Sequence, residues 1–268
     1  MTPGSTLIPC AGTSLQGAFR ARATTPERDC RAAASPPTED LRILDTALPR
    51  LWDISPPVHE GSPVFPGDTP YAQTWSWTIG PGCPVNVATL SLSPHVGAHA
   101  DAPRHYDADG ACAGALPLEP YLGPCRVVHA LGAHPLVTWD HVAARLQGPG
   151  PLPPRVLVRT YHQHPADRWD HNLAGLDPAL VERLADLGVT LVGIDTASID
   201  PASSKDLPSH QTVRRRGLRV LENLLLDAVP EGDYELIALP LKLMQADASP
   251  VRAVLRTLPT NATPPEAR

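Results

Sequence analysis

The chain has 268 residues, 42% of them hydrophobic, so it is long enough to bury a core as one large domain or two small ones. Its formal net charge of -6 includes no basic block, which argues against nucleic acid and anionic membranes as partners, and no apolar run approaches the roughly 20 residues of a membrane span. Five cysteines form an odd set without a Cys-x-x-Cys pair, which argues against a disulfide framework or a thiolate zinc site and favours a reducing cytoplasm.

The N-terminal part of the chain differs in character from the rest. It carries proline, alanine, threonine and arginine with little apolar periodicity, and residues 32–38 are typical of a linker. We expect a disordered extension over residues 1–48, a folded domain over 49–262 and a tail over 263–268. Two further origins of the extension stay open. The first 26 residues contain arginine but no acid, as in an organelle transit peptide, and a start codon assigned too early would give a similar tail.

The folded part begins with short extended segments. Residues 51–68 alternate apolar pieces with proline, glycine and serine, which favour turns. The segments 71–79 and 85–92 alternate in large part between apolar and polar positions, which predicts two strands. The second strand leads directly into a histidine-rich segment, so a rigid element is expected to position a functional loop.

Strands and helices alternate in the remainder of the chain. The expected strands are residues 125–131, 155–160, 189–195, 234–243 and 250–258. One helix is expected from a cap at Thr138 to Leu146, and a second is bracketed by Asp177 as N-cap, Pro178 at the first helical position and Gly188 past the end. This order predicts an α/β fold with a mixed sheet and packed helices in one domain.

The histidine-rich segment, residues 93–106, has the composition of a metal site. His95, His99, Asp101 and His105 lie within eleven residues and are separated mainly by small residues and proline, which a packing core would not select. Imidazole nitrogens and carboxylate oxygens form a mixed set that zinc accepts at about 2.0 to 2.2 Å, and that manganese or iron also tolerates. The alternative is a polar loop whose histidines face water.

The backbone of this segment is predicted to curl. A straight strand would hold His95 and His99 about 13 Å apart, too far for one ion to bind both. Pro94, Gly97 and Pro103 argue against a regular helix. We therefore expect a curled loop in which Gly97 takes a positive φ and the neighbouring alanines leave room for side chains to converge.

A second candidate ligand is Glu222. Apolar residues recur at helical spacing over residues 216–229, which predicts a helix with Glu222 at its apolar face, where a carboxylate needs a partner. The partner is a metal ion or a nearby arginine. The candidate arginines are Arg214, Arg215, Arg216 and Arg219. One unbroken helix would hold His210 about 18 Å from Glu222, so the two could share a metal only if His210 lies in a folded-back loop, which Pro208 and Gly217 would allow.

The histidine segment resembles a known signature. The pattern from His95 to His105 is similar to the His-x-Gly-Thr-His-x-Asp-x-Pro-x-His motif of the cyclase family of metal-dependent hydrolases, with Ala98 in the place of threonine. This version resembles the bacterial kynurenine formamidase branch of the family. The similarity runs from about Leu51 to about Leu258, and it is carried further by residues 193–201, 204–205, 220–222, 232–242 and 248–254.

The resemblance implies a fold, a site and a reaction. The family fold is a swivelling β/β/α domain that forms homodimers. The residues that match a dinuclear site are His95, His99, Asp101, His210 and Glu222. They would hold two divalent ions, zinc or alternatively manganese, while His105 would act as proton donor and acceptor. The implied reaction hydrolyses the small-molecule substrate N-formylkynurenine to kynurenine and formate in tryptophan degradation.

One departure concerns substrate binding. Phe65 stands where the family commonly has a tryptophan that packs on the aromatic ring of the substrate, and it offers less area and no indole donor. Two rival functions stay open: a hydrolase of another amide, such as the cyclic amide of isatin, and a non-catalytic metal-binding protein. The presence of His105 argues against the second, although this histidine could also have only a structural role.

Overall fold

The computed structural model describes residues 49–147 and 150–258. The expectations for residues 1–48 and 263–268 fall outside this part of the chain. The described residues form two compact units: the outer part of a hairpin, residues 75–88, and a main body that contains the remainder. Among them no helix has the length and apolar character needed to cross a membrane.

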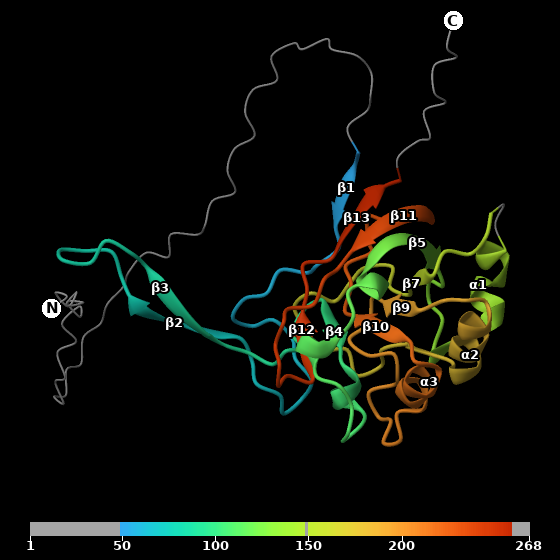
Figure 1. The fold of residues 1–268 in the computed structure, drawn as a ribbon, viewed down its shortest axis with the longest axis horizontal. Helices are drawn as coiled ribbons and strands as arrows, with labels where there is room; N and C mark the ends of the chain where they lie inside the picture. The colour runs from blue at the N-terminus through green and yellow to red at the C-terminus, as the bar shows by residue number, and fades with distance from the viewer. Residues whose placement is uncertain (1–48, 148–149, 259–268) are drawn as a thin grey trace, which may run out of the picture. The chain divides into compact units, whose positions relative to one another are not determined.

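The described part of the main body contains a mixed nine-stranded sheet (Figure 1). Its strands, in spatial order, are β1 (Leu51–Asp53), β13 (Val254–Thr257), β11 (Gly232–Ile237), β5 (Leu122–His129), β7 (Arg155–Arg159), β9 (Leu191–Ile194), β10 (Arg219–Glu222), β4 (His99–Asp101) and β12 (Ala248–Pro250). The central strands β5, β7, β9 and β10 run parallel, and the pairs on either side are antiparallel. The expected mixed sheet is therefore confirmed.

Three helices pack on one face of the sheet: α1 (Trp139–Leu146), α2 (Pro178–Asp186) and α3 (Pro208–Arg216) (Figure 1). The first two match the sequence prediction. Asp177 caps α2, because its side chain accepts a hydrogen bond from the backbone N–H of Ala179 at 2.8 Å, and Gly188 lies beyond the end with a φ of 88°.

Shorter elements complete the described chain. The 3-10 turns are η1 (Pro103–His105), η2 (Ala113–Ala115) and η3 (Glu119–Tyr121), and the two-stranded pairs are β2 (Ala72–Trp77) with β3 (Val87–Ser91) and β6 (Leu136–Val137) with β8 (Gly175–Leu176). The β2–β3 hairpin matches the two strands expected from alternation. Its β3 strand leads into the histidine segment, as the sequence indicates.

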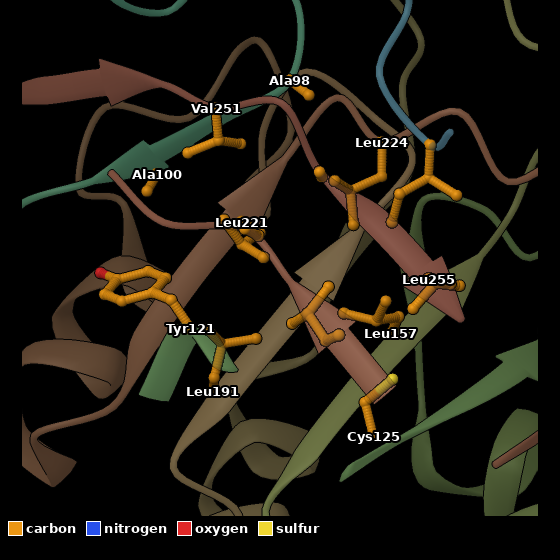
Figure 2. Close-up of a cluster of buried hydrophobic side chains, with 14 of the residues drawn as sticks. Ala98, Ala100, Tyr121, Cys125, Leu157, Leu191, Leu221, Leu224, Val251 and Leu255 are labelled. Carbon is orange, nitrogen blue, oxygen red and sulfur yellow. The ribbon is translucent and has the colours of Figure 1, made fainter. Parts of the chain in front are cut away.

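Successive side chains of the parallel strands point to opposite faces of the sheet, and they form one apolar cluster on each face. Val156 and Val192 face the helices, whereas Leu157, Leu191 and Leu221 point to the other face. There they pack with residues of β5, β13 and the loops, so the sheet curls around this second cluster (Figure 2). Burying each leucine contributes about 1.5 to 3 kcal/mol, which makes this double-faced packing a rigid support for the strand ends.

The predicted helix over residues 216–229 is wrong. Helix α3 ends at Arg216, Gly217 follows with a φ of 68°, and β10 then pairs with β9 and β4. Because β10 is covered on both faces, its apolar run has no two-residue alternation that would separate a strand from a helix.

Smaller differences concern strand boundaries. The segment expected over 234–243 ends at Ile237, and the one expected over 250–258 is divided between β12 and β13. The curled histidine segment is also only partly a loop. The curl covers residues 94–98, after which His99–Asp101 forms β4, because its backbone pairs with β10 on one side and β12 on the other.

Candidate metal centre and active site

The register between β4 and β10 brings the first three candidate ligands together. Glu222 lies directly opposite His99, and Asp101 is two residues further along β4, so the three side chains share one face of the sheet. The His99 Nε2 lies 3.2 Å from Glu222 Oε2 and 3.5 Å from Asp101 Oδ1. Pairing of strands far apart in the sequence thus creates the centre of the cluster.

The turn before β4 adds His95. Gly97 has a φ of 66°, and a Cβ at this position would lie 2.6 Å from a methyl carbon of Val58, so the turn strongly favours glycine. The positive φ expected here is confirmed. The turn folds His95 back until its Nδ1 lies 3.1 Å from Asp101 Oδ1.

Helix α3 supplies the third imidazole. The Nε2 of His210 lies 3.2 Å from Asp101 Oδ2 and 3.4 Å from Glu222 Oε1. The sequence predicted that His210 approaches Glu222 through a loop, and in this detail it is wrong: His210 lies in a helix, and the chain reverses at Gly217 so that β10 returns Glu222 to it.

Each of these histidines is held through its outer ring nitrogen. The Nδ1 of His99 donates to the carbonyl oxygen of Gly97 at 2.9 Å, and the Nδ1 of His210 donates to Asp200 at 2.7 Å. The Nε2 of His95 lies 3.0 Å from Asp247 Oδ2. Such contacts fix the tautomer and direct the inner nitrogens toward the common centre, an arrangement typical of metal-binding histidines.

The donor set fits a divalent metal ion. The exposed fractions of His99, Asp101, His210 and Glu222 are between 0 and 3%, which excludes the alternative of a polar loop facing water. The buried atoms His99 Nε2 and Asp101 Oδ1 have no hydrogen-bond partner in the described part of the chain. Two buried carboxylates require a cationic partner, and imidazole nitrogen with carboxylate oxygen is a ligand set for zinc or manganese.

The alternative prediction, that an arginine is the partner of Glu222, is wrong. Arg214 pairs with Asp107, and both Arg215 and Arg216 pair with Glu182 on α2. Arg219 donates to backbone carbonyl groups at residues 217 and 218. The Glu222 carboxylate instead accepts from the backbone N–H of Ile199 at 2.7 Å and faces His99 and His210.

Charge coupling within the cluster is strong. Burial alone would raise the pKa of Asp101, but the imidazoles of His210 and His95, which face its two oxygens, hold this pKa well below its ordinary value. Burial alone would lower the pKa of His95, but the carboxylates of Asp101 and Asp247 outweigh it and raise the pKa to about 10. Protons and metal ions therefore compete for the same inner nitrogens.

His105 lies at the edge of the cluster, about one-third exposed. Its Nδ1 is 3.2 Å from Asp247 Oδ2, the same oxygen that contacts His95, and ligating atoms of these three residues lie within 4.8 Å of one another. The other proton carriers near it are less suitable. Asp107 is paired with Arg214, and burial raises the pKa of the Tyr106 hydroxyl above its ordinary value.

A cavity of about 300 Å³ adjoins the cluster. His95, His105, His210 and Glu222 line it together with the aromatic residues Phe65, Tyr161 and Trp169. Phe65 is 51% exposed, and its ring meets that of Trp169 edge to face, with centroids 5.3 Å apart. The cavity is thus open to a small molecule with an aromatic group on one side and a hydrolysable bond at the ligand cluster.

Sequence reasoning missed several residues of this site. Asp200 and Asp247 orient histidines, and Trp169 and Asn223 line the cavity. Asp200 and Asp247 lie far from the histidine segment in the sequence, so no local pattern marked them as orienting groups. Trp169 and Asn223 belong to no pattern that distinguishes them from surface residues.

The sequence and the fold resemble those of known proteins. The profile of the family described as "Putative cyclase" matches residues 52–201. A protein named kynurenine formamidase from Paracidovorax citrulli is 71% identical over 208 residues, which are 77% of this chain and 96% of that protein. A solved structure titled as a predicted metal-dependent hydrolase from Bacillus stearothermophilus is 29% identical and has a TM-score of 0.67, with 79% of this chain and 100% of that one covered.

A more distant structure shares the fold. It is an isatin hydrolase bound to the product analogue thioisatinate, 22% identical, with a TM-score of 0.67 over 79% of this chain and 93% of that one. The fold class expected from the sequence is therefore confirmed by solved structures as well as by the sheet itself.

Proposed function

This chain belongs to the Cyclase family, and from that premise we propose that it is an arylformamidase that hydrolyses N-formyl-L-kynurenine to L-kynurenine and formate in tryptophan degradation. The observation that carries the proposal is the convergence of three imidazoles on Asp101 and Glu222 beside a cavity with an aromatic wall. A formanilide needs both features: a polar centre that attacks the formyl carbon and a surface for its ring.

We assign the metal ligands from the way the two carboxylates divide their oxygens. Asp101 offers Oδ1 to His95 and Oδ2 to His210, and Glu222 offers Oε2 to His99 and Oε1 to His210. With His95, His99 and His210, these carboxylates would hold two divalent ions, zinc or alternatively manganese. When bound, the ions supply Lewis-acid chemistry that acidifies a water molecule and polarises the formyl carbonyl.

We assign the proton transfer to His105. Asp247 accepts from its Nδ1, which leaves the Nε2 as the nitrogen able to exchange a proton with the reactants. His105 would take a proton from the attacking water and return it to the arylamine nitrogen as the C–N bond breaks. A purely structural role would not require a partly exposed histidine on the cavity wall.

We assign substrate contact to Phe65 and self-association to the hairpin. The half-exposed ring of Phe65 offers one face or edge to an aryl group. In the hairpin, Trp75, Trp77 and Ile79 are 49 to 62% exposed, and such an apolar patch is suited to bind a second copy of the chain in a homodimer. The odd set of cysteines favours the cytoplasm as the location.

The test is an absorbance assay of purified protein with N-formyl-L-kynurenine, in which product formation is followed directly. Isatin serves as the comparison substrate, and protein treated with a chelator serves as the control. We expect turnover of N-formyl-L-kynurenine that the chelator abolishes. Turnover of isatin alone would support the rival amide hydrolase, and full metal binding without turnover of either compound would support a non-catalytic metal-binding protein.

A further inference from the structure

Asn223 has an unusual backbone conformation directly after the proposed ligand Glu222. Its φ is 57°, in the left-handed region that asparagine tolerates better than most residues, and its N–H donates to the carbonyl oxygen of Thr196 at 2.7 Å. The residue is only 8% exposed, yet it lines the cavity. The backbone therefore directs a buried amide side chain toward the space beside the metal ligands.

A buried histidine fixes the orientation of this amide. The Nε2 of His164 lies 2.9 Å from Asn223 Oδ1, while the Nδ1 of His164 is buried and has no partner among the described residues. Burial lowers the pKa of His164, so the ring is neutral at physiological pH. A buried N–H without an acceptor is rarer in proteins than a bare acceptor, so the proton belongs on Nε2 and is donated to Oδ1.

This arrangement leaves the amide nitrogen of Asn223 available. Its oxygen is engaged by His164, and within the described residues the Nδ2 has no hydrogen-bond partner and is not sealed from the cavity. Asp68, Asp170 and Tyr161 on the cavity wall are not free to donate. Asp68 and Asp170 are acceptors when ionised, and the Tyr161 hydroxyl already donates to Asp170 at 2.8 Å.

We infer that the Nδ2 of Asn223 donates a hydrogen bond to the oxygen of the carbonyl under attack, and that His164 is the positioning residue that holds it there. This inference rests on the proposed formamidase function. Asn223 follows Glu222 directly and both residues line the cavity, so the amide borders the space that a substrate beside the metal ligands would occupy. A neutral, preoriented donor becomes more favourable as negative charge develops on that oxygen in the transition state.

The decisive variant is Asn223→Gly, because glycine accepts a φ of 57° and removes only the amide. Asn223→Asp keeps the acceptor for His164 and removes the donor. We expect both to keep the wild-type metal content and to lose about 10²-fold in kcat with little change in KM. The loss should be the same for N-formyl-L-kynurenine and for formanilide, which retains only the aryl ring and the formamide.

The outcomes separate this inference from the proposed function. If the wild-type protein hydrolyses neither formamide, the proposed function fails. If the wild-type protein is active and Asn223→Gly has equal kcat, the inference alone is overturned. It is also overturned if the loss appears in KM, if it is confined to N-formyl-L-kynurenine, or if both variants lose metal.

The role of His164 is tested by a double-mutant cycle. His164→Leu should lower kcat in the wild-type background and have no further effect on kcat in the Asn223→Gly background, because its action passes through the missing amide. His164→Gln, which can still donate to Asn223 Oδ1, should restore part of the loss. Equal effects of His164→Leu in both backgrounds would show a merely structural role and overturn the assignment.

Discussion

The metal-ligand cluster and the aromatic wall of the cavity are built in different ways. His99, Asp101 and Glu222 lie on paired strands, are at most 3% exposed, and face one another across the sheet. Phe65 and Trp169 lie in segments without helix or strand, and their rings meet each other in one edge-to-face pair. The proposed metal ligands are therefore held by a rigid sheet. The residues proposed for substrate contact lie in loops, which can change without disturbing that sheet.

Asp101→Asn should disrupt the metal-ligand cluster on the sheet and have the largest effect of the predicted changes. An amide keeps the size of the side chain but cannot supply the anionic oxygens that face His95 and His210. We expect turnover to fall by roughly 10³-fold or more, because a bound metal ion supplies several kcal/mol of transition-state stabilisation. The metal content of the variant, measured by elemental analysis, should fall below the value near two ions per chain that we expect for the wild-type protein. A wild-type value that stays at one under saturating metal would contradict the dinuclear centre.

His105→Ala should separate proton transfer from metal binding. If this side chain only moves protons, the variant keeps its metal and loses roughly 10² to 10⁴ in kcat, the usual range for one general acid or base. His99→Ala is the matched control, since removal of a ligand should reduce metal content and turnover together. Loss of one metal equivalent in His105→Ala would make His105 a ligand, and wild-type turnover with full metal would refute the assigned role.

Phe65→Ala should affect only the aromatic wall of the cavity, which is formed by loops. Removal of the ring should raise the KM for N-formyl-L-kynurenine by about tenfold, the scale of one aromatic contact, with kcat and metal content unchanged. Phe65→Trp is the paired variant and should lower KM or leave it unchanged, because the larger ring offers more area. A change in kcat without a change in KM would show that the wall and the metal centre are not independent.

The same division explains what could be predicted from the sequence. The ligands within the histidine segment are close in the sequence, so composition alone singled out His95, His99 and Asp101 and required the positive φ of Gly97. Helix α2 was bracketed by local capping residues in the same way. Clustered ligands, helix caps and turn glycines can be predicted from the sequence because the residues involved are neighbours along the chain.

Nonlocal pairing could not be predicted in this way. The position of Glu222 opposite His99 depends on the register of β10 with β4, and the apolar spacing around Glu222 fitted a helix equally well. Asp247 was visible only as a residue in a turn, although it contacts both His95 and His105. Asn223 and Trp169 have no sequence pattern, and their importance depends on where distant segments meet.

The smallest expected effect is a pH dependence of stability rather than a change in turnover. In protein treated with a chelator, the pKa values of His95 and His210 are raised above the ordinary histidine value, to about 10 for His95, by the carboxylates that face them. A group with a raised pKa stabilises the folded state fully below its unfolded pKa, near 6.5, and this contribution is lost as the pH rises toward the folded pKa. Asp101 and Glu222 have lowered pKa values and stay ionised throughout this range, so they add no slope.

We therefore expect the denaturant midpoint of chelated protein to decrease as the pH rises from about 6.5 toward about 10, the window set by the ordinary and the raised histidine pKa values. Metal-loaded protein is the matched control, because metal ions replace the protons on the same inner nitrogens and remove this dependence. Burial also raises the pKa of the Cys125 thiol, to about 12. Any contribution of this thiol to the pH dependence of stability is the same in the chelated and the metal-loaded protein. Parallel curves for the two samples would mean that the imidazoles do not carry protons in the metal-free cluster, and that metal binding at neutral pH releases none.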